Sequence, residues 1–382
     1  MKERQRESHM LSPERENLFR SAEAELRFPA QVYRLGDRFE GLTPELADVT
    51  MLDVTNIPGC HYGAKNVFVP IIRHLESTRS SDSKSRVIVS PEKAILVETS
   101  TGNGWVAFSD AAEKLGYEHK VIMPDGLPDA RYYHPQGRKV EIIRTPKDEY
   151  AEGMPKQLRA LMNQNRQRLA EGKKIYVSPN HAVASVDITI EAMSDLGRQL
   201  IANLGQVHDP LRVVISMGNG ASLCAIGEYV KKHSSNAKVI AAESFAYGGG
   251  YDNFAKKRGL ASYAELFDVD PGNPGLMAKF SAFGTNAPIG IKLPLHERAM
   301  NGDLIDDYVL FSDDKVLEAY RELGPTGEHL ENALNLSNYS KLPRVLFETY
   351  GNSTLANISV ASRFAGKGER VVAIAYDSRK QY

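Results

Sequence analysis

The sequence has little cysteine, no long apolar run and no surplus of charge of either sign. Two cysteines, Cys60 and Cys224, stand among 382 residues. This excludes a disulfide scaffold and a multi-cysteine zinc site, and is typical of a reducing compartment. The longest apolar runs, such as 371–375, are strand-sized, far short of the roughly 20 residues that a membrane helix needs. With 47 Lys and Arg against 48 Asp and Glu, no basic surplus indicates a nucleic-acid partner.

The first 18 residues are polar and charged, and we expect them to form a flexible or surface-docked arm. No apolar core follows this charged segment, so the sequence predicts no secretory signal and a cytoplasmic location. The length allows roughly two to three domains. A hydrophobic content of 42% with 25% charged residues is typical of a globular protein.

Short apolar strands alternate with amphipathic helices along most of the chain. This alternation predicts an α/β fold in which helices cover a parallel sheet. Pro70 lies inside one helical pattern, and we expect it near the start of that helix, where proline is tolerated. Strands are expected at 49–54, 94–98, 120–123, 139–143, 174–177, 212–216, 238–242 and 370–376, and helices at 64–76, 105–115, 155–171, 188–204, 352–364 and from 222 to about 232.

Two of the expected strands run into turns of small residues that precede a helix. One turn is Thr99-Ser-Thr-Gly-Asn-Gly104 and the other is Gly218-Asn-Gly-Ala-Ser222. Glycine lets the backbone approach a ligand closely, and a helix start offers N–H groups and a positive dipole end to an anion. The alternative is that these turns only connect strands to helices. Neither matches a dinucleotide fingerprint or a P-loop, so we expect a ligand, or a pair of ligands, with two anionic groups.

A third element places Lys65 at the start of the helix expected over 64–76. The positive helix end and desolvation both disfavour a charged amine there, and a neutral amine is what imine chemistry needs. The alternative is an ordinary solvated lysine.

Together the three elements resemble the fold-type II pyridoxal-phosphate enzymes. This group, the tryptophan synthase β-like superfamily, includes cysteine synthase, cystathionine β-synthase, threonine synthase and the serine or threonine dehydratases. The family's Pro-x-Gly-Ser-x-Lys-Asp-Arg motif is matched by Pro58–Lys65, with two residues inserted and Asp-Arg lost. Its Ser-Gly-Asn-Thr-Gly, Gly-Thr-Gly-Gly-Thr, Gly-x-Ser-Ser and Pro-Asp-Ser-Gly-x-x-Tyr motifs are matched at 101–105, 218–222, 351–354 and 376–382.

The resemblance implies a role for each matched residue. Lys65 would form the Schiff base with pyridoxal 5'-phosphate and then act as the base at the substrate Cα. No metal is implied. Asn103 would bind the ring hydroxyl of the cofactor, and its pyridine nitrogen would face Thr354 or Ser353. The cofactor phosphate would be held by Gly218, Asn219, Gly220, Ala221 and Ser222. The substrate carboxylate would be held by Thr99, Ser100, Thr101 and Gly102.

The resemblance also implies a two-domain, three-layer parallel-sheet fold. A smaller domain at 60–186 would hold the substrate carboxylate, and a larger one, 1–59 plus 187–382, the cofactor phosphate. The implied reaction is β-elimination or β-replacement, through an aminoacrylate, on an amino acid with a leaving group at Cβ. The alternatives are a threonine synthase-like or dehydratase-like lyase, and a non-catalytic binder that senses an amino acid. A homodimer that binds neither nucleic acid nor membrane follows by analogy.

Several residues depart from the family pattern and indicate a divergent member with a non-standard amino-acid substrate. His61 and Tyr62, in the inserted bend, are either substrate-facing proton donors or packing residues. His181 lies where cysteine synthases have Gln-Phe-x-Asn-Pro, and either touches the substrate or belongs to a strand-end turn. Trp105 replaces a glycine and either narrows the pocket or packs under it. Residues 245–253 form either a substrate lid or a plain surface loop.

Overall fold

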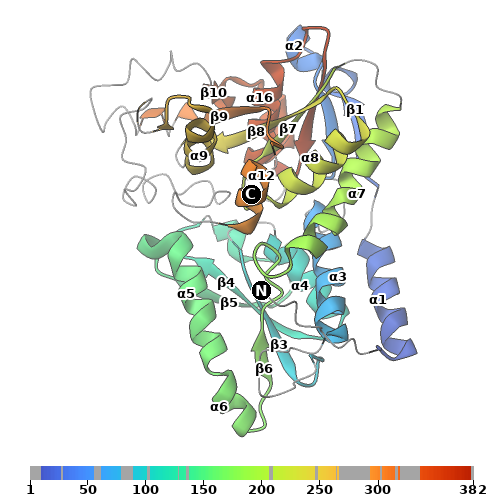
Figure 1. Cartoon of the computed structure of the whole chain (residues 1–382), viewed down its shortest axis with the longest axis vertical. Coiled ribbons are helices and arrows are strands. Elements are labelled where there is room, and N and C mark those ends of the chain that lie inside the picture. The colour runs from blue at the N-terminus through green and yellow to red at the C-terminus, as the bar shows by residue number, and fades with distance from the viewer. Residues whose placement is uncertain are drawn as a thin grey trace. The chain divides into compact units, whose positions relative to one another are not determined.

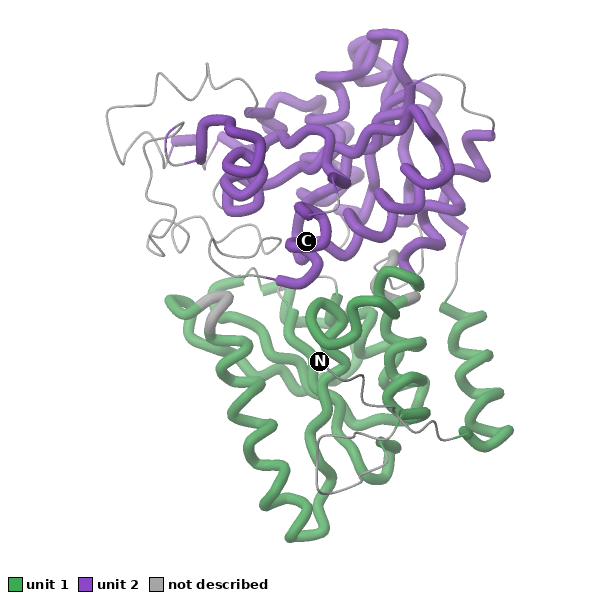
Figure 2. Tube along the Cα trace, in the orientation of Figure 1, with its two compact units in different colours: residues 1–28, 57–192 green, residues 29–56, 193–382 purple. Residues whose placement is uncertain are grey.

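The computed structural model contains two compact units, coloured separately in Figure 2. Unit 1 comprises residues 1–28 and 57–192, and unit 2 comprises 29–56 and 193–382. The boundaries that the resemblance implies differ chiefly at the N-terminus, since residues 1–28 belong to unit 1. The structure describes residues 10–26, 29–55, 62–78, 89–100, 104–127, 129–134, 137–205, 210–245, 248–263, 265, 293–301, 303–314, 317–318 and 336–379, without the side chains of 62–66, 130 and 150–152.

Unit 1 is built on a parallel four-stranded sheet with the order β5-β4-β3-β6 (Figure 1). Alternate residues of these strands pack on opposite faces. Leu96 and Val121 belong to a core shared with Phe68 and Phe108, while Val97 packs with Leu161 on the other side. Three layers result, as expected. Their elements are β3 (Ala94–Thr99), β4 (Glu118–Pro124), β5 (Glu141–Thr145), β6 (Ile175–Val177), α1 (Pro13–Leu26), α3 (Tyr62–Ser77), α4 (Gly104–Lys114), α5 (Tyr150–Asn163), α6 (Asn165–Ala170), η2 (Asp129–Tyr132) and η3 (Lys147–Glu149).

The N-terminal arm becomes a docked helix from Pro13 onward. Helix α1 packs on α3, and Phe19 is fully buried. Arg15 donates from Nε to Glu76 Oε2 at 2.8 Å and from Nη1 to the Leu115 carbonyl at 2.9 Å. The arm therefore belongs to the unit 1 core from its first helical turn.

Two helices differ from the sequence prediction. Pro70 is the ninth residue of α3 rather than a member of its first turn. A proline there costs one backbone hydrogen bond, and burial of the neighbouring Ile71 and Ile72, both fully buried, offsets that cost. The helix expected over 155–171 begins earlier, at Tyr150, and is divided at Gln164 into α5 and α6.

Unit 2 contains a seven-stranded sheet with the order β1-β2-β11-β7-β8-β9-β10. Only β1 is antiparallel to its neighbour. The central strands are buried on both faces, as parallel sheets require, and Val213, Val214 and Ile215 are fully buried. The strands are β1 (Gln31–Arg34), β2 (Thr50–Asp53), β7 (Leu211–Ser216), β8 (Ala237–Ser244), β9 (Asp307–Ser312), β10 (Leu336–Asn338) and β11 (Arg370–Ala375).

Two helices pack directly on the centre of this sheet. Helix α8 (Ala221–His233) packs on β7 and β8, and α16 (Asn352–Ser362) packs on β11 and β7. Both begin at the carboxyl ends of strands, where open α/β sheets bind ligands. The other helical elements are α7 (Val186–Leu204), which crosses the unit boundary, α2 (Pro44–Ala47), α9 (Gly249–Arg258), α12 (Pro294–Asn301), α15 (Arg344–Thr349), η1 (Leu35–Asp37) and η4 (Tyr339–Lys341).

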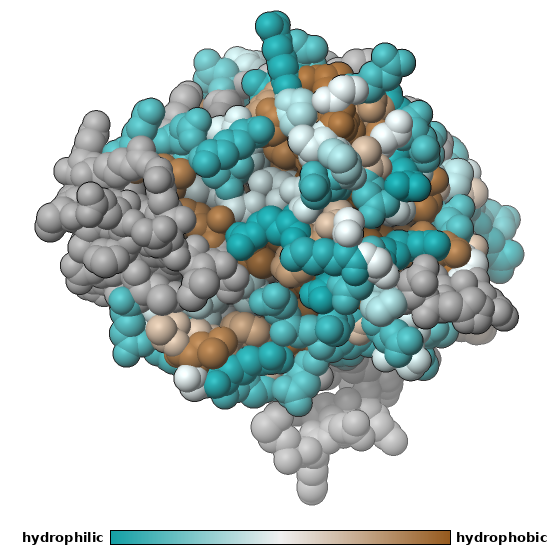
Figure 3. All heavy atoms as spheres, turned by 90° about the horizontal axis from the view of Figure 1, so that it is seen from above, coloured by the Kyte–Doolittle hydropathy of each residue, from teal (hydrophilic) through white to brown (hydrophobic). Residues whose placement is uncertain are grey.

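Hydrophilic and apolar side chains are interspersed over the face that Figure 3 shows. Within the described ranges, no helix is long and apolar enough to cross a membrane. The α/β class with parallel strands, expected from the alternating pattern, is confirmed.

Candidate functional site

The glycine turn at 218–222 connects β7 to α8, as the sequence predicts. Gly220 is the N-cap of α8, with a φ of +91°. A Cβ at this position would lie 3.1 Å from Leu295 Cβ, so both the conformation and the packing require glycine. The side chain of Asn219 accepts the N–H of Ala221 at 3.0 Å. The turn is therefore held in one conformation at the positive end of a helix of 13 residues.

Helix α12 supports this turn from a distant part of the sequence. His296 Nε2 lies 2.6 Å from the Gly218 carbonyl, and burial lowers the pKa of His296. A neutral ring that donates its Nε2 proton to Gly218 fits both observations. The Cys224 thiol donates to the Leu295 carbonyl at 3.2 Å, and burial raises its pKa to about 12, so it stays an unreactive thiol. Sequence reasoning missed His296, because no motif marks residues 293–301.

A second part of unit 2 brings β7, α16 and β11 together. Ser216 Oγ contacts Asn357 Oδ1 at 2.7 Å and the Ser353 carbonyl at 3.4 Å. Asn357 Nδ2 donates to the Ile374 carbonyl at 2.8 Å. The first turn of α16 is thereby fixed to the strand that leads into the glycine turn. Ser216 and Asn357 were missed by sequence reasoning, because their role depends on strand order.

Thr354 is fully buried, and its hydroxyl is fully engaged. It donates to Asp377 Oδ1 at 2.8 Å and accepts the N–H groups of Tyr376 and Asp377 at 3.0 and 3.3 Å. A hydroxyl has one proton and two lone pairs, so nothing remains for a ligand. Ser353 is half-buried in the same helical turn, and among the residues that the structure describes its hydroxyl makes no such set of contacts. Of the two residues expected at the pyridine nitrogen, the hydrogen bonding favours Ser353.

In unit 1, Thr99 and Ser100 lie at the carboxyl end of β3. The N–H of Thr99 donates to Glu98 Oε1 at 2.9 Å, and that of Ser100 donates to the Ile122 carbonyl at 3.1 Å. Any contribution of these two residues to a ligand therefore comes from their side chains. Thr101, Gly102 and Asn103 lie outside the described residues.

Lys65 lies in the first turn of α3, which begins at Tyr62. The side chains of Lys65 and Tyr62 lie outside the described residues, as does all of His61. Trp105, in α4, is 2% exposed and donates from Nε1 to the Arg131 carbonyl at 3.0 Å. The indole therefore packs within the unit 1 core.

The segment 245–253, for which the sequence left open a substrate lid or a plain surface loop, contains a buried helix start. Helix α9 begins at Gly249, and the side chain of Glu243, at the end of β8, accepts the N–H groups of Gly250 and Tyr251 at 3.2 and 2.9 Å. Tyr308 donates its hydroxyl to the same carboxylate at 3.0 Å. Burial raises the pKa of Glu243 to about 7. Residues 246–247 lie outside the described residues.

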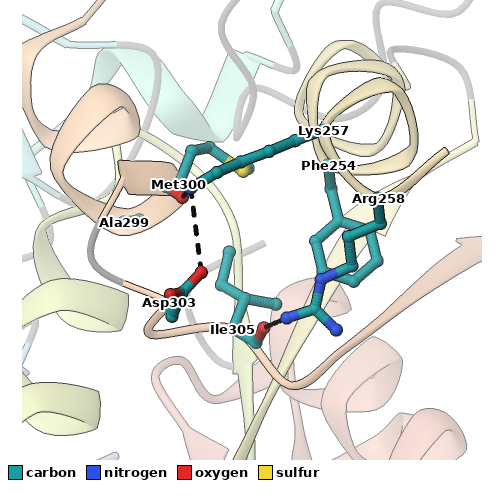
Figure 4. Close-up of a pocket in the computed structure, with 7 residues that line it drawn as sticks. All are labelled: Phe254, Lys257, Arg258, Ala299, Met300, Asp303 and Ile305. Atoms are coloured by element: carbon teal, nitrogen blue, oxygen red, sulfur yellow. Dashed lines mark hydrogen bonds and ion pairs between the residues drawn. The ribbon is translucent and has the colours of Figure 1, made fainter.

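The pocket drawn in Figure 4 lies between α9, α12 and the residues before β9. Its two cationic side chains are already engaged. Lys257 contacts the Met300 carbonyl and lies 3.8 Å from Asp303, and Arg258 donates to the Ile305 carbonyl at 2.6 Å. This pocket contains none of the predicted site residues. Among the residues that the structure describes, no group of three or more His, Cys, Asp or Glu is placed to hold a metal.

Comparison with known proteins matches most of the chain to one family. The family described as "Pyridoxal-phosphate dependent enzyme" matches residues 73–333. The matched range contains the turn at 218–222 and excludes Lys65 and 353–354. No curated protein matches the chain.

Several solved structures share the fold at low sequence identity. An O-ureido-L-serine synthase is 15% identical with a TM-score of 0.57, covering 94% of this chain and 92% of its own. A hydrogen sulfide-producing enzyme from Fusobacterium nucleatum is 15% identical with a TM-score of 0.60, and the match covers 98% of this chain and 99% of that enzyme. A cysteine synthase from Entamoeba histolytica is 15% identical with a TM-score of 0.57, and the match covers 98% of this chain and 91% of that enzyme.

Proposed function

The chain belongs to the pyridoxal-phosphate dependent enzymes, and from that premise we propose that it catalyses β-elimination or β-replacement on an amino acid with a leaving group at Cβ. The names of the similar structures support this reaction class: an O-ureido-L-serine synthase, a hydrogen sulfide-producing enzyme and a cysteine synthase. At 15% identity these structures are evidence for the fold, and the substrate is part of the proposal.

The turn at 218–222 carries the proposal. Its glycine is required at position 220, its backbone is fixed by Asn219 and His296, and it precedes a helix. A phosphate group fits such a turn, because backbone N–H groups and the helix dipole meet its charge without any cationic side chain. The residues present therefore fit the phosphate of the cofactor.

Lys65 would bind the cofactor covalently through its amine and move the proton at the substrate Cα. When bound, pyridoxal phosphate withdraws electrons from Cα and makes that proton removable. Thr99, Ser100, Thr101 and Gly102 would hold the substrate carboxylate, Asn103 the ring hydroxyl and Ser353 the ring nitrogen. His61 and Tyr62 would line the substrate side of the same site.

The proposal includes a homodimer in the cytoplasm, by analogy with the family. It does not depend on either feature, since every residue given a role belongs to one chain. Size-exclusion chromatography with light scattering measures the oligomeric state.

An assay of amino acids with different Cβ groups tests the function. Purified protein with added cofactor is incubated with O-acetylserine, serine, cysteine, β-chloroalanine or threonine, with and without a thiol nucleophile. We expect a keto acid plus ammonia, or a new β-substituted amino acid, from at least one of them. Binding of an amino acid that shifts the cofactor spectrum without any product would support a sensing protein instead. Exclusive turnover of threonine would support the dehydratase-like alternative.

A further inference from the structure

Glu98 buries a carboxylate at the carboxyl edge of the unit 1 sheet. Its side chain is 3% exposed, and Oε1 accepts the N–H of Thr99 at 2.9 Å. The other oxygen, Oε2, is buried and has no hydrogen-bond donor among the described residues. It lies 3.8 Å from Nδ1 of His181. A buried carboxylate oxygen is costly without a partner, and the imidazole is the group placed to supply a positive charge.

The loop around His181 holds that residue in place. Asn180 has a φ of +42°, in the left-handed region, and the Ser185 hydroxyl donates to the Pro179 carbonyl at 2.8 Å. The Thr189 hydroxyl donates to the His181 carbonyl at 2.7 Å. A non-glycine residue in the left-handed region persists where the surrounding contacts determine it, and such residues are concentrated at functional sites. The backbone that carries the imidazole is therefore fixed on both sides.

The ring itself packs against α3. His181 and Phe68 form an edge-to-face pair with centroids 5.4 Å apart. Phe68 follows Lys65 by three residues, and positions three apart share a face of a helix. His181 therefore contacts the helical face on which Lys65 lies one turn earlier. Its side chain is 21% exposed although Nδ1 is buried.

The strand order places His181 beside the expected carboxylate turn. Strands β3 and β6 are parallel neighbours, with Leu96 paired to Val177. Their carboxyl ends meet at the same edge, so the segment carrying His181 leaves the sheet beside the segment that begins at Thr99. Three features thus converge on one edge of unit 1: the substrate turn, the helix of Lys65 and an imidazole backed by a buried carboxylate.

We propose that His181 is the acid that protonates the leaving group at the substrate Cβ, and that Glu98 is its positioning residue. This inference rests on the proposed function and deepens it. It indicates a substrate whose leaving group departs poorly as an anion, such as a hydroxyl or an amine. A pair of this kind fixes the tautomer and stabilises the charged ring.

Protons and electron pairs balance in this step. Lys65 takes the Cα proton, and the electron pair of the broken Cα–H bond forms the second bond between Cα and Cβ. The bond from Cβ to the leaving atom breaks, its electron pair stays with that atom, and the imidazolium proton of His181 bonds to it. The neutral imidazole regains a proton from water. Glu98 remains ionised throughout and holds the imidazolium by charge.

The proposal is tested with two substrates, of which one has a leaving group that must be protonated and the other does not. Serine loses a hydroxyl, which must be protonated, whereas β-chloroalanine loses chloride, which needs no proton. We expect His181→Gln to lower kcat/KM on serine by about 100-fold or more, the usual contribution of a general acid, and to leave β-chloroalanine little changed. His233→Gln, at an exposed histidine stacked on Tyr229 in α8, is the control and should change neither. Equal losses of His181→Gln on both substrates would overturn the proposal.

A second readout does not depend on turnover. Nitrogen-15 NMR of the histidine rings reports which nitrogen carries the proton. We expect the His181 ring of the wild-type protein to carry it on Nδ1, facing Glu98, and the ring of Glu98→Gln to lose this preference. The same tautomer in both proteins would remove Glu98 from the proposed step. A protein that binds cofactor but processes none of the five amino acids named above would contradict the proposed function, and the NMR result would still decide the pairing of Glu98 with His181.

Discussion

The hydroxyl of Thr354 donates to the carboxylate of Asp377 across 2.8 Å. Asp377 is 1% exposed and Thr354 fully buried, so this bond joins the first turn of α16 to the segment that follows β11. The two N–H groups that Thr354 accepts complete the arrangement. Thr354 therefore ties helix α16 to the carboxyl end of β11, and the proposed ligand contact falls to the neighbouring Ser353.

Thr354→Val should lower the stability of the fold, whereas Ser353→Ala should weaken cofactor binding. Valine keeps the shape of threonine but removes the hydroxyl that donates to the Asp377 carboxylate and accepts two buried N–H groups. We expect a loss of about 2–4 kcal/mol in the free energy of unfolding, the cost of such unsatisfied groups, measured by urea denaturation. Ser353→Ala should stay within about 0.5 kcal/mol of the wild-type protein but weaken cofactor binding.

Thr354→Ser is the matched control for this pair, because serine keeps the hydroxyl and removes only a methyl group. It should restore most of the stability that valine loses. A stable Thr354→Val protein with weakened cofactor binding would assign the ligand contact to Thr354 and contradict this account.

Gly220→Ala should lower both stability and cofactor affinity. The new methyl group would meet Leu295 Cβ at 3.1 Å and His296 Cδ2 at 3.2 Å, on a backbone with φ +91°. Gly368 has a φ of +75°, and a methyl group there would have no other atom within 4 Å, so it is the matched control for backbone strain alone. Each substitution costs about 1–3 kcal/mol of strain, but only Gly220→Ala should raise the Kd for pyridoxal phosphate. Equal Kd values for the two variants would contradict the assignment of this turn.

Glu243 should make stability depend on pH. Burial raises its pKa from 4.5 to about 7, so between these values the folded protein binds more protons than the unfolded chain. The contribution of Glu243 is therefore fully present below about pH 4.5 and is lost as the pH rises through about 7. The urea midpoint compared at the two ends of this range should fall with rising pH more in the wild-type protein than in Glu243→Gln.

Glu348→Gln is the control for this measurement, because Glu348 is exposed and pairs with Arg344 one turn away. It should follow the wild-type pH dependence. A Glu243→Gln protein with the wild-type slope would show that the carboxylate titrates normally.

The sequence predicts most of the strands and misses β1, β9 and β10. The strands β2, β3, β4, β5, β6, β7, β8 and β11 are near their expected positions, because buried parallel strands are short apolar runs bounded by turns. Strand β1 is a four-residue edge strand with exposed ends, and β10 has three residues, too few for a pattern. The apolar run of β9 was also not predicted, since periodicity alone does not separate a short buried strand from a helix segment.

The motifs of the site were visible in the sequence, but their supporting contacts were not. The turn at 218–222 could be found because its chemistry is local. His296 supports it from 78 residues away, and Ser216 meets Asn357 across 141 residues, so only the fold reveals these contacts. The choice between Ser353 and Thr354 required the hydrogen-bond partners of each hydroxyl. Similarly, the packing of His181 against Glu98 depends on β3 and β6 being neighbours.

The central claim is that Lys65 binds pyridoxal phosphate covalently. Borohydride reduction of the protein with bound cofactor makes such a link permanent, and peptide mass mapping then identifies the modified lysine. We expect one phosphopyridoxyl group, on Lys65, and loss of the visible cofactor band in Lys65→Ala with an unchanged urea midpoint. A label on another lysine, or a Lys65→Ala protein that keeps the band, would contradict the claim.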